Sequence, residues 1–131
     1  MLSNETIARI CWGATGTLLE HWKHDLGRWE DLIPEDRAAL AGMTLNLRLG
    51  SSLEGSHRHW CEIMADAGWS YAEVRDDTKR CHPWLCEWQN LDEGSRLFFK
   101  MHRHIVFFLV MEYPEGSDFA QGLTPRRFPV T

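Results

Sequence analysis

The sequence contains no apolar run long enough to span a lipid bilayer, which requires about 20 consecutive apolar residues. Its nearest approach is the stretch from Ile105 to Met111, a run of seven residues with the length of a buried helical segment. The first nine residues also lack a basic start followed by an apolar stretch, so we expect no secretory signal peptide. The sequence therefore predicts a cytoplasmic protein without a membrane partner.

Positive charge is also scarce. The formal net charge is −5, with 14 Lys and Arg residues against 19 Asp and Glu residues. General nucleic-acid binding depends on a basic surface that neutralises phosphates, so this charge balance argues against such a partner. It leaves room for a small anionic ligand, which needs only a few local positive groups.

No familiar catalytic motif occurs in the sequence. There is no Gly-x-Ser-x-Gly nucleophile motif, no glycine-rich phosphate loop and no His-Glu-x-x-His zinc motif. Cys81 and His82 do not make a nucleophile–base pair by adjacency, because neighbouring side chains of an extended segment point apart. We therefore predict a non-enzymatic protein that uses no cofactor.

The four cysteines lie at positions 11, 61, 81 and 86, and none belongs to a Cys-x-x-Cys pair. Without a secretion signal, free thiols are expected rather than disulfides. Structural zinc is an alternative, with two clusters of candidate ligands: His57, His59 and Cys61, and Cys81, His82 and Cys86. A helical 57–61 segment would point His59 away from its neighbours, so scattered residues are the preferred interpretation and no metal is predicted.

The sequence does have enough apolar material for one buried core. Its 131 residues are 44% hydrophobic and include seven Trp and six Phe, which fits a single domain. Apolar residues at three- and four-residue steps predict helices over residues 4–22, 34–49, 56–68 and 92–111. The expected inward residues are Ile7, Ile10, Cys11, Ala14, Leu18 and Trp22; Ala38, Ala41, Leu45 and Leu49; Trp60, Ile63, Met64 and Ala67; and Leu97, Met101, Ile105, Phe108 and Leu109.

Local signals complete the expected fold. Ser56 is a good cap for the third helix and Gly68 a good C-terminal residue for it. Residues 69–74 alternate enough for a short strand or hairpin arm. We therefore expect a mainly α, small single domain of about four helices with a short extended or hairpin segment. It spans residues 1–113, and proline and glycine predict an irregular C-terminal tail over residues 114–131.

The most distinctive stretch runs from His57 to Leu85, where aromatics beside a helix-ending glycine lead through a charged turn into His-Pro. It resembles the ryanodine receptor (RyR) domain, a small module repeated in calcium-release channels and also found alone in bacterial and phage proteins. The matching positions are Ser56-His57, Trp60, Gly68-Trp69, Tyr71, Asp76 or Asp77, Lys79, His82-Pro83, Leu85 and Leu91. Segments 6–11 and 29–32, followed by Arg37, also match, so the resemblance covers about residues 5–110.

Several departures from the family pattern bear on the ligand rather than on the fold. Met64 stands where Lys is usual, Ala72 where Gly follows the Tyr, and Asp92 where the Pro of Leu-Pro is expected. Cys86-Glu87-Trp88 replaces a Pro-Tyr step, and Phe98-Phe99 replaces a usual Lys-Asp. A site that loses a lysine and gains a tryptophan is expected to bind a different ligand from its relatives.

The residues around the charged turn predict a pocket for a planar, anionic, nucleotide-like small molecule. The candidate ligand-binding residues are Trp69, Tyr71, Arg75, Lys79, His82 and Trp88. The aromatic rings offer stacking faces, the two cations can meet phosphate oxygens, and the imidazole can orient the ligand. The resemblance points the same way, because it implies a sensor of a nucleotide-derived signal. In a phage, such a domain would be a sponge or sensor of a signalling nucleotide in the host cytoplasm.

The main alternative is a structural or protein-interaction module without a small-molecule ligand. A Trp that follows a helix-ending glycine often covers the core, so Trp69 has a structural interpretation beside the ligand-binding one. Trp60 is expected in the core. Phe98-Phe99, where the family usually has charge, suggests a partner surface, and a homodimer is one arrangement that would bury it.

Overall fold

Within the described part of the chain, four α-helices form the frame of the protein. The computed structural model describes residues 2–19 and 27–112, so the predicted tail 114–131 and the predicted end of the first helix lie outside it. The α-helices are α1 (Asn4–Leu19), α2 (Pro34–Arg48), α3 (Leu53–Asp66) and α4 (Glu93–Glu112). Two short 3-10 helices, η2 (Trp29–Asp31) and η3 (Trp88–Asn90), and a two-stranded sheet are also present. The predicted mainly α class is confirmed.

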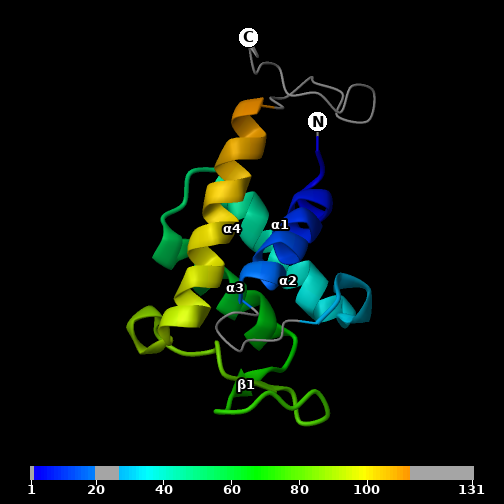
Figure 1. The fold of residues 1–131 in the computed structure, drawn as a ribbon. Helices are drawn as coiled ribbons and strands as arrows, with labels where there is room; N and C mark the ends of the chain where they lie inside the picture. Colours follow the sequence, from blue (N-terminus) through cyan, green and yellow to red (C-terminus); the bar gives the residue numbers. More distant parts are fainter. Residues whose placement is uncertain (1, 20–26, 113–131) are drawn as a thin grey trace.

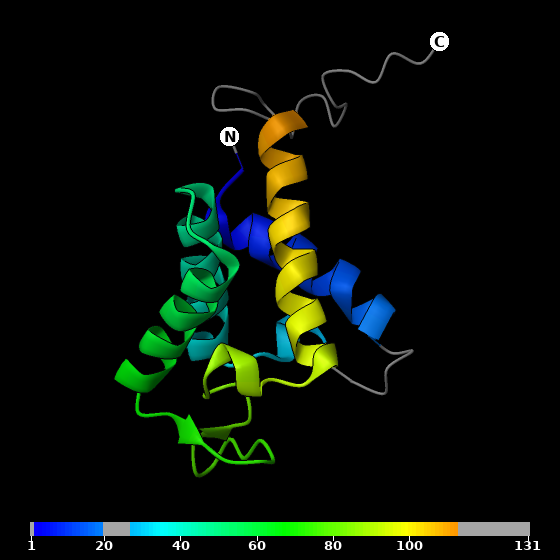
Figure 2. The same cartoon turned by 90° about the vertical axis from the view of Figure 1, so that its left-hand side faces the viewer.

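The α-helices pack as one body, and the segment between α3 and α4 closes one end of it (Figure 1). Helices α2 and α3 lie side by side, while α4 packs against both α1 and α2 (Figure 2). Gly42 of α2 permits a close approach of α3, because a Cβ at this position would collide with Cδ1 of Ile63. None of the described helices is long and apolar enough to cross a membrane.

Helix α3, which carries part of the candidate site, begins earlier than the sequence predicted. Its N-cap is Ser52, whose hydroxyl accepts the backbone N–H of Gly55 at 3.0 Å. Ser56, the predicted cap, lies inside the helix and is buried. Gly68 follows the helix with a φ of +93°, a left-handed conformation that suits glycine, so the predicted end is confirmed.

The buried face of α2 is not the predicted one. Ala38, Leu45 and Leu49 are exposed, and Leu49 keeps 78% of its surface. Ala41 is half-buried. The buried residues of α2 are Asp36, Ala39, Leu40, Met43, Thr44 and Leu47. Some of the buried residues of α2 are polar and have hydrogen-bond partners inside the protein. The buried face of the helix therefore lies about one position away from the stripe of its most apolar residues.

In α1 and α4 the predicted faces are correct in part, because Ile7, Cys11 and Leu109 are buried as predicted, and α3 follows the prediction more closely. In α1 the buried residues are Ile7, Ala8, Cys11, Trp12, Thr15 and Leu19, and in α4 they include Phe98, Phe99, His102, Val106 and Leu109. The predicted inward Ala14 and Phe108 are exposed, and Ile10, Leu97, Met101 and Ile105 are half-buried. Trp22 and the side chain of Leu18 lie outside the described residues. In α3, Trp60 and Met64 are buried as predicted, while Ile63 and Ala67 are half-buried.

The extended segment pairs with a later part of the same connection. Strand β1 (Ser70–Tyr71) runs parallel to β2 (Cys81–His82), with Ser70 opposite Cys81 and Tyr71 opposite His82. The prediction of extended structure is confirmed, but the parallel direction excludes a simple hairpin between these strands. All four cysteines are free thiols, as expected.

Candidate functional site

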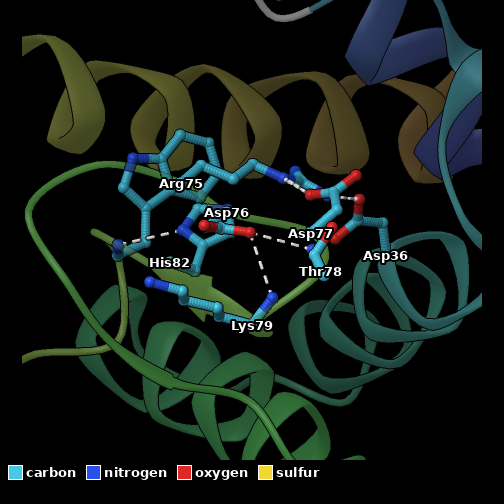
Figure 3. Close-up of polar contacts among 8 residues, drawn as sticks. Asp36, Arg75, Asp76, Asp77, Thr78, Lys79 and His82 are labelled. Atoms are coloured by element: carbon cyan, nitrogen blue, oxygen red, sulfur yellow. Dashed lines mark hydrogen bonds and ion pairs between the residues drawn. The ribbon is translucent and has the colours of Figure 1, made fainter.

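The loop between β1 and β2 is organised by its own acidic residue. Oδ1 of Asp76 accepts the backbone N–H groups of Thr78 and Lys79, each at 3.0 Å (Figure 3). This arrangement is a side-chain-stabilised turn, the structural role that Asp residues commonly have in loops. The Lys79 side chain is exposed and lines none of the hollows discussed below, so the structure does not bring it to the other candidate residues.

Arg75 anchors the same loop to α2. Its guanidinium contacts the carboxylate of Asp36 through Nη2 and that of Asp77 through Nε, the latter at 2.6 Å (Figure 3). It also lies over the ring of Trp69, 5.3 Å from the ring centroid. Burial alone would lower the pKa of Arg75, but its bonds to the two carboxylates raise that pKa overall. Arg75 is therefore a structural cation rather than one available to a phosphate.

Three of the predicted aromatic residues meet at one open hollow beside α3, here named the α3 cleft. The cleft has a volume of about 660 Å³. Its lining residues are Glu54, His57, Arg58, Cys61, Ala65, Trp69, Ser70, Tyr71, Leu85, Cys86, Glu87, Trp88, Gln89 and Asn90. Helix α3 forms one wall, β1 a second, and the segment from Leu85 to Asn90 a third.

The three aromatic side chains of the α3 cleft differ in burial. Trp69 is only 4% exposed and is therefore part of the core as well as of the cleft wall. Trp88 is half-buried and packs its ring against His57 and Phe99, with centroid separations of 5.7 and 5.9 Å. Tyr71 is 54% exposed, so its ring can adjust to a ligand. The cleft thus combines two rings packed against the protein with one exposed ring.

The charged residues of the α3 cleft were not singled out from the sequence. Arg58 is the one Lys or Arg among the described residues that line the cleft, and Glu54 and Glu87 also line it. Glu54, Arg58, Cys61 and Ala65 recur at three- and four-residue steps, which places them together on a face of α3 beside the one that buries Trp60. This spacing in the sequence is the signal from which the α3 wall of the cleft could have been predicted.

His57 and Cys61 belong to the inner wall of the α3 cleft. Nε2 of His57 lies 2.9 Å from the carbonyl oxygen of Trp84 and 3.4 Å from Sγ of Cys61. Burial lowers the pKa of His57 and raises that of the Cys61 thiol to about 12, so both groups are neutral near neutral pH. In residues 2–19 and 27–112, no three His, Cys, Asp or Glu side chains come together in a way that could hold a metal ion.

His82 does not line the α3 cleft. It is 6% exposed, and its Nδ1 accepts the backbone N–H of Trp84 at 3.0 Å. Burial, reinforced by the charge of Arg75, lowers its pKa to about 3. Together with Arg75 it lines a second hollow of about 350 Å³. The six predicted ligand-binding residues therefore fall into three groups. Trp69, Tyr71 and Trp88 line the α3 cleft. Arg75 and His82 line the second hollow, and Lys79 lines neither.

Replacing Trp69 with phenylalanine is expected to change the free energy of unfolding by less than about 1 kcal/mol. Nε1 of Trp69 is buried, and no hydrogen-bond acceptor for it exists among the described residues. Phenylalanine keeps an aromatic ring under Arg75 and removes the unpaired donor, so the lost packing is partly offset. Urea unfolding at neutral pH measures the difference.

Trp84→Phe is the matched control for this prediction. Nε1 of Trp84 donates to Oγ of Ser95 at 2.8 Å, so phenylalanine here leaves a buried hydroxyl without its donor. We expect this variant to lose about 1–2 kcal/mol more than Trp69→Phe. Equal losses in the two variants would show that the unpaired indole of Trp69 carries no energetic penalty.

The proposed partner surface at Phe98-Phe99 is wrong. The two side chains are 0% and 1% exposed and pack against Trp84, with ring centroids 4.9 and 5.2 Å away. They form the centre of the aromatic core. Phe107 and Phe108, later in α4, are the exposed phenylalanines, at 39% and 45%.

No family model matches the chain, and no solved structure matches it.

Proposed function

We propose that this protein is an RyR-like domain that captures a nucleotide-derived small molecule in the α3 cleft without chemically changing it. The observation that carries the proposal is the convergence of Trp69, Tyr71 and Trp88 on one open hollow beside Arg58. Flat aromatic faces beside a cation suit a planar base that carries a phosphate. The resemblance of residues 57–85 to the RyR family supports the same class of ligand.

The dimensions of the α3 cleft support a ligand of nucleotide size. Its volume of about 660 Å³ lies within the range of small-molecule sites, which is about 300–1,000 Å³. Trp69 and Trp88 are held by the core, so they present fixed surfaces that lose little entropy on binding. Tyr71 can close over a base from the outside, since its side chain is exposed.

The charges of the α3 cleft favour a ligand with few phosphates. Arg58 can bind one phosphate in a bidentate manner, whereas Glu54 and Glu87 repel further negative charge. The same carboxylates can accept hydrogen bonds from ribose hydroxyls. A nucleoside monophosphate, a cyclic nucleotide or an ADP-ribose fragment therefore suits the cleft better than a triphosphate.

A protein that holds such a molecule lowers its free concentration. This is the action of a sponge, and a phage-encoded sponge would weaken a host defence that relies on a nucleotide signal. The same binding event would also serve a sensor. The role of a sponge or sensor follows from the proposed binding and from the resemblance. A result that rejects the proposed binding therefore also rejects this role.

Tyr71→Ala is expected to weaken the binding of adenosine monophosphate about 5- to 100-fold, the usual cost of losing one aromatic stacking face. Isothermal titration calorimetry of wild type and variant measures the change. Val74→Ala is the control, since Val74 follows strand β1, is 77% exposed and lies outside the α3 cleft. An unchanged affinity for adenosine monophosphate after Tyr71→Ala would show that the Tyr71 ring does not belong to the proposed site.

Arg58→Ala separates phosphate recognition from base stacking. We expect it to weaken adenosine monophosphate about 10-fold or more and to leave adenosine itself nearly unaffected. Arg103→Ala removes an exposed cation of α4 that does not line the cleft, and it should change neither affinity. A loss of the same size for both ligands after Arg58→Ala would contradict the assigned role of Arg58.

A further inference from the structure

The second hollow, here named the Trp12 cleft, differs from the α3 cleft in its volume and in its lining residues. Its volume of about 350 Å³ lies near the lower end of the range for small-molecule sites, which starts at about 300 Å³. It is formed where α1, the region of η2, the charged loop and the segment after β2 meet. None of the described residues that line it also lines the α3 cleft.

Two indole rings form fixed walls of the Trp12 cleft. Nε1 of Trp12 donates to the carbonyl oxygen of Gly27 at 3.0 Å, and Nε1 of Trp84 donates to Oγ of Ser95 at 2.8 Å. Both indole N–H groups are therefore satisfied within the protein, and neither ring needs a ligand for its polar atom. What the rings contribute to the cleft is apolar, flat surface.

His82, which lines the Trp12 cleft, carries a hydrogen-bond donor that has no acceptor among the described residues. Nδ1 of His82 accepts the backbone N–H of Trp84 at 3.0 Å. Burial lowers the pKa of this imidazole to about 3, so the ring is neutral and its one hydrogen sits on Nε2. No acceptor for that hydrogen occurs among residues 2–19 and 27–112, although the ring is almost fully buried.

The charges around the Trp12 cleft balance. Two cations, Arg28 and Arg75, and two carboxylates, Asp31 and Asp77, line it. Arg75 is held by Asp36 and Asp77, and Arg28 lies 3.5 Å from Glu30. An anionic ligand would meet the carboxylates and a cationic one the guanidinium groups, so an uncharged ligand has the smallest electrostatic cost.

We propose that the Trp12 cleft is a second binding site, for a small uncharged aromatic ring that carries a carbonyl or ring-nitrogen acceptor. The ring lies against Trp12 and Trp84, and its acceptor receives the hydrogen of Nε2 of His82. Aromatic amides and free nucleobases are the chemical classes that meet both requirements. The proposal is independent of the α3 cleft, since no described residue lines both sites.

A matched series of one-ring probes tests the proposal. Benzamide has a neutral acceptor, benzoate the same shape with a negative charge, and toluene the ring without an acceptor. With about nine non-hydrogen atoms, benzamide is expected to bind with a dissociation constant of about 1 mM or below. Benzoate and toluene are expected to bind at least about 10-fold more weakly. Nitrogen-edited NMR of the indole and imidazole groups follows each titration.

The location of the bound probe decides the outcome. Binding in the Trp12 cleft shifts the Nε1–H signals of Trp12 and Trp84 and the imidazole signals of His82, and gives proton–proton contacts from benzamide to both indoles. His82→Phe should weaken benzamide about 10-fold, whereas Arg58→Ala should leave it unchanged. If His82→Phe does not fold, the contacts in the wild-type protein still decide.

Three results would overturn the proposal. The first is absence of benzamide binding at about ten times the expected dissociation constant. The second is equal affinity for benzamide and benzoate, which would remove the charge argument. The third is a set of shifts confined to Tyr71 and Trp88, which would place the probe in the α3 cleft. Failure of adenosine monophosphate to bind, with benzamide still bound at Trp12, would reject the proposed function alone.

Discussion

Replacing Arg75 with leucine is expected to lower the free energy of unfolding by about 3 kcal/mol or more, because the change leaves a buried carboxylate without its cation. The side chain of Asp36 is 5% exposed and is held by Nη2 of Arg75. Burial raises the pKa of Asp36 even against the opposing effect of that guanidinium. Without Arg75, the carboxylate must stay unpaired, take up a proton or draw water into the core. Urea unfolding followed by tryptophan fluorescence at neutral pH measures the loss.

Two further variants separate charge from packing in this prediction. Asp36→Asn combined with Arg75→Leu removes both charges and should recover most of the lost stability. Asp77→Asn removes a partner that is 55% exposed and should cost less than about 1 kcal/mol. If the double variant is as unstable as Arg75→Leu, the lost contact with Trp69, and not the unpaired carboxylate, is the cause.

The stability of the protein is expected to fall as the pH is lowered from about 7 towards about 4, because His82 and His102 are buried as neutral rings. Burial lowers the pKa of each from 6.5 to about 3. Since the folded pKa lies below the unfolded one, the unfolded chain takes up these protons first. The stability contribution is complete above pH 6.5 and is lost progressively towards pH 3, by about 1.4 kcal/mol per pH unit for each residue.

His102→Gln isolates one of these two contributions. The hydroxyl of Thr44 donates to the carbonyl oxygen of Leu40 at 2.9 Å, so it accepts its 2.8 Å bond from Nε2–H of His102. A glutamine amide can donate to the same hydroxyl and does not titrate. Between about pH 7 and about pH 5, the variant should lose about 2 kcal/mol less stability than the wild type.

Urea unfolding of wild type and variant at several pH values measures this difference. His104→Gln is the matched control, because His104 occupies an exposed position of the same helix and its replacement should leave the pH dependence intact. Parallel pH profiles for the wild type and His102→Gln would show that His102 does not contribute to the acid sensitivity.

The helices could be predicted from the sequence, whereas their buried faces could not. Periodic apolar residues and Gly68 give helix positions directly. Thr15, Thr44 and His102 look like solvent-facing residues in such a pattern, yet all three are buried. Thr15 hides its hydroxyl by donating to the carbonyl oxygen of Cys11 at 2.7 Å, and Thr44 does the same with Leu40. The pattern of polar and apolar residues does not show such bonds. The expected buried faces of α1, α2 and α4 therefore differ in part from the observed ones.

The candidate site could be predicted in its aromatic part and not in its charged part. Trp69 and Tyr71 follow the helix-ending Gly68 directly, so local signals place them together. Arg75 was expected to serve a ligand because its guanidinium lies in the charged turn beside the aromatic residues and can meet phosphate oxygens. Its decisive partner is Asp36, 39 positions earlier, and a long-range ion pair of this kind has no local signature. Arg58 was missed because an exposed cation on a helix is ordinary until a cleft forms beside it.

A thermal-shift panel tests the central claim, that the α3 cleft binds a nucleotide-derived molecule, most directly. The panel holds nucleosides, mono-, di- and triphosphates, cyclic nucleotides and ADP-ribose derivatives, each with wild type and Tyr71→Ala. Binding to the folded state alone stabilises it by about 2.7 kcal/mol at a hundredfold excess over the dissociation constant. We predict a clear rise in Tm with a ligand that carries few phosphates, and a much smaller rise in the variant. A flat panel, or equal rises in both proteins, would contradict the account and favour a protein-interaction module.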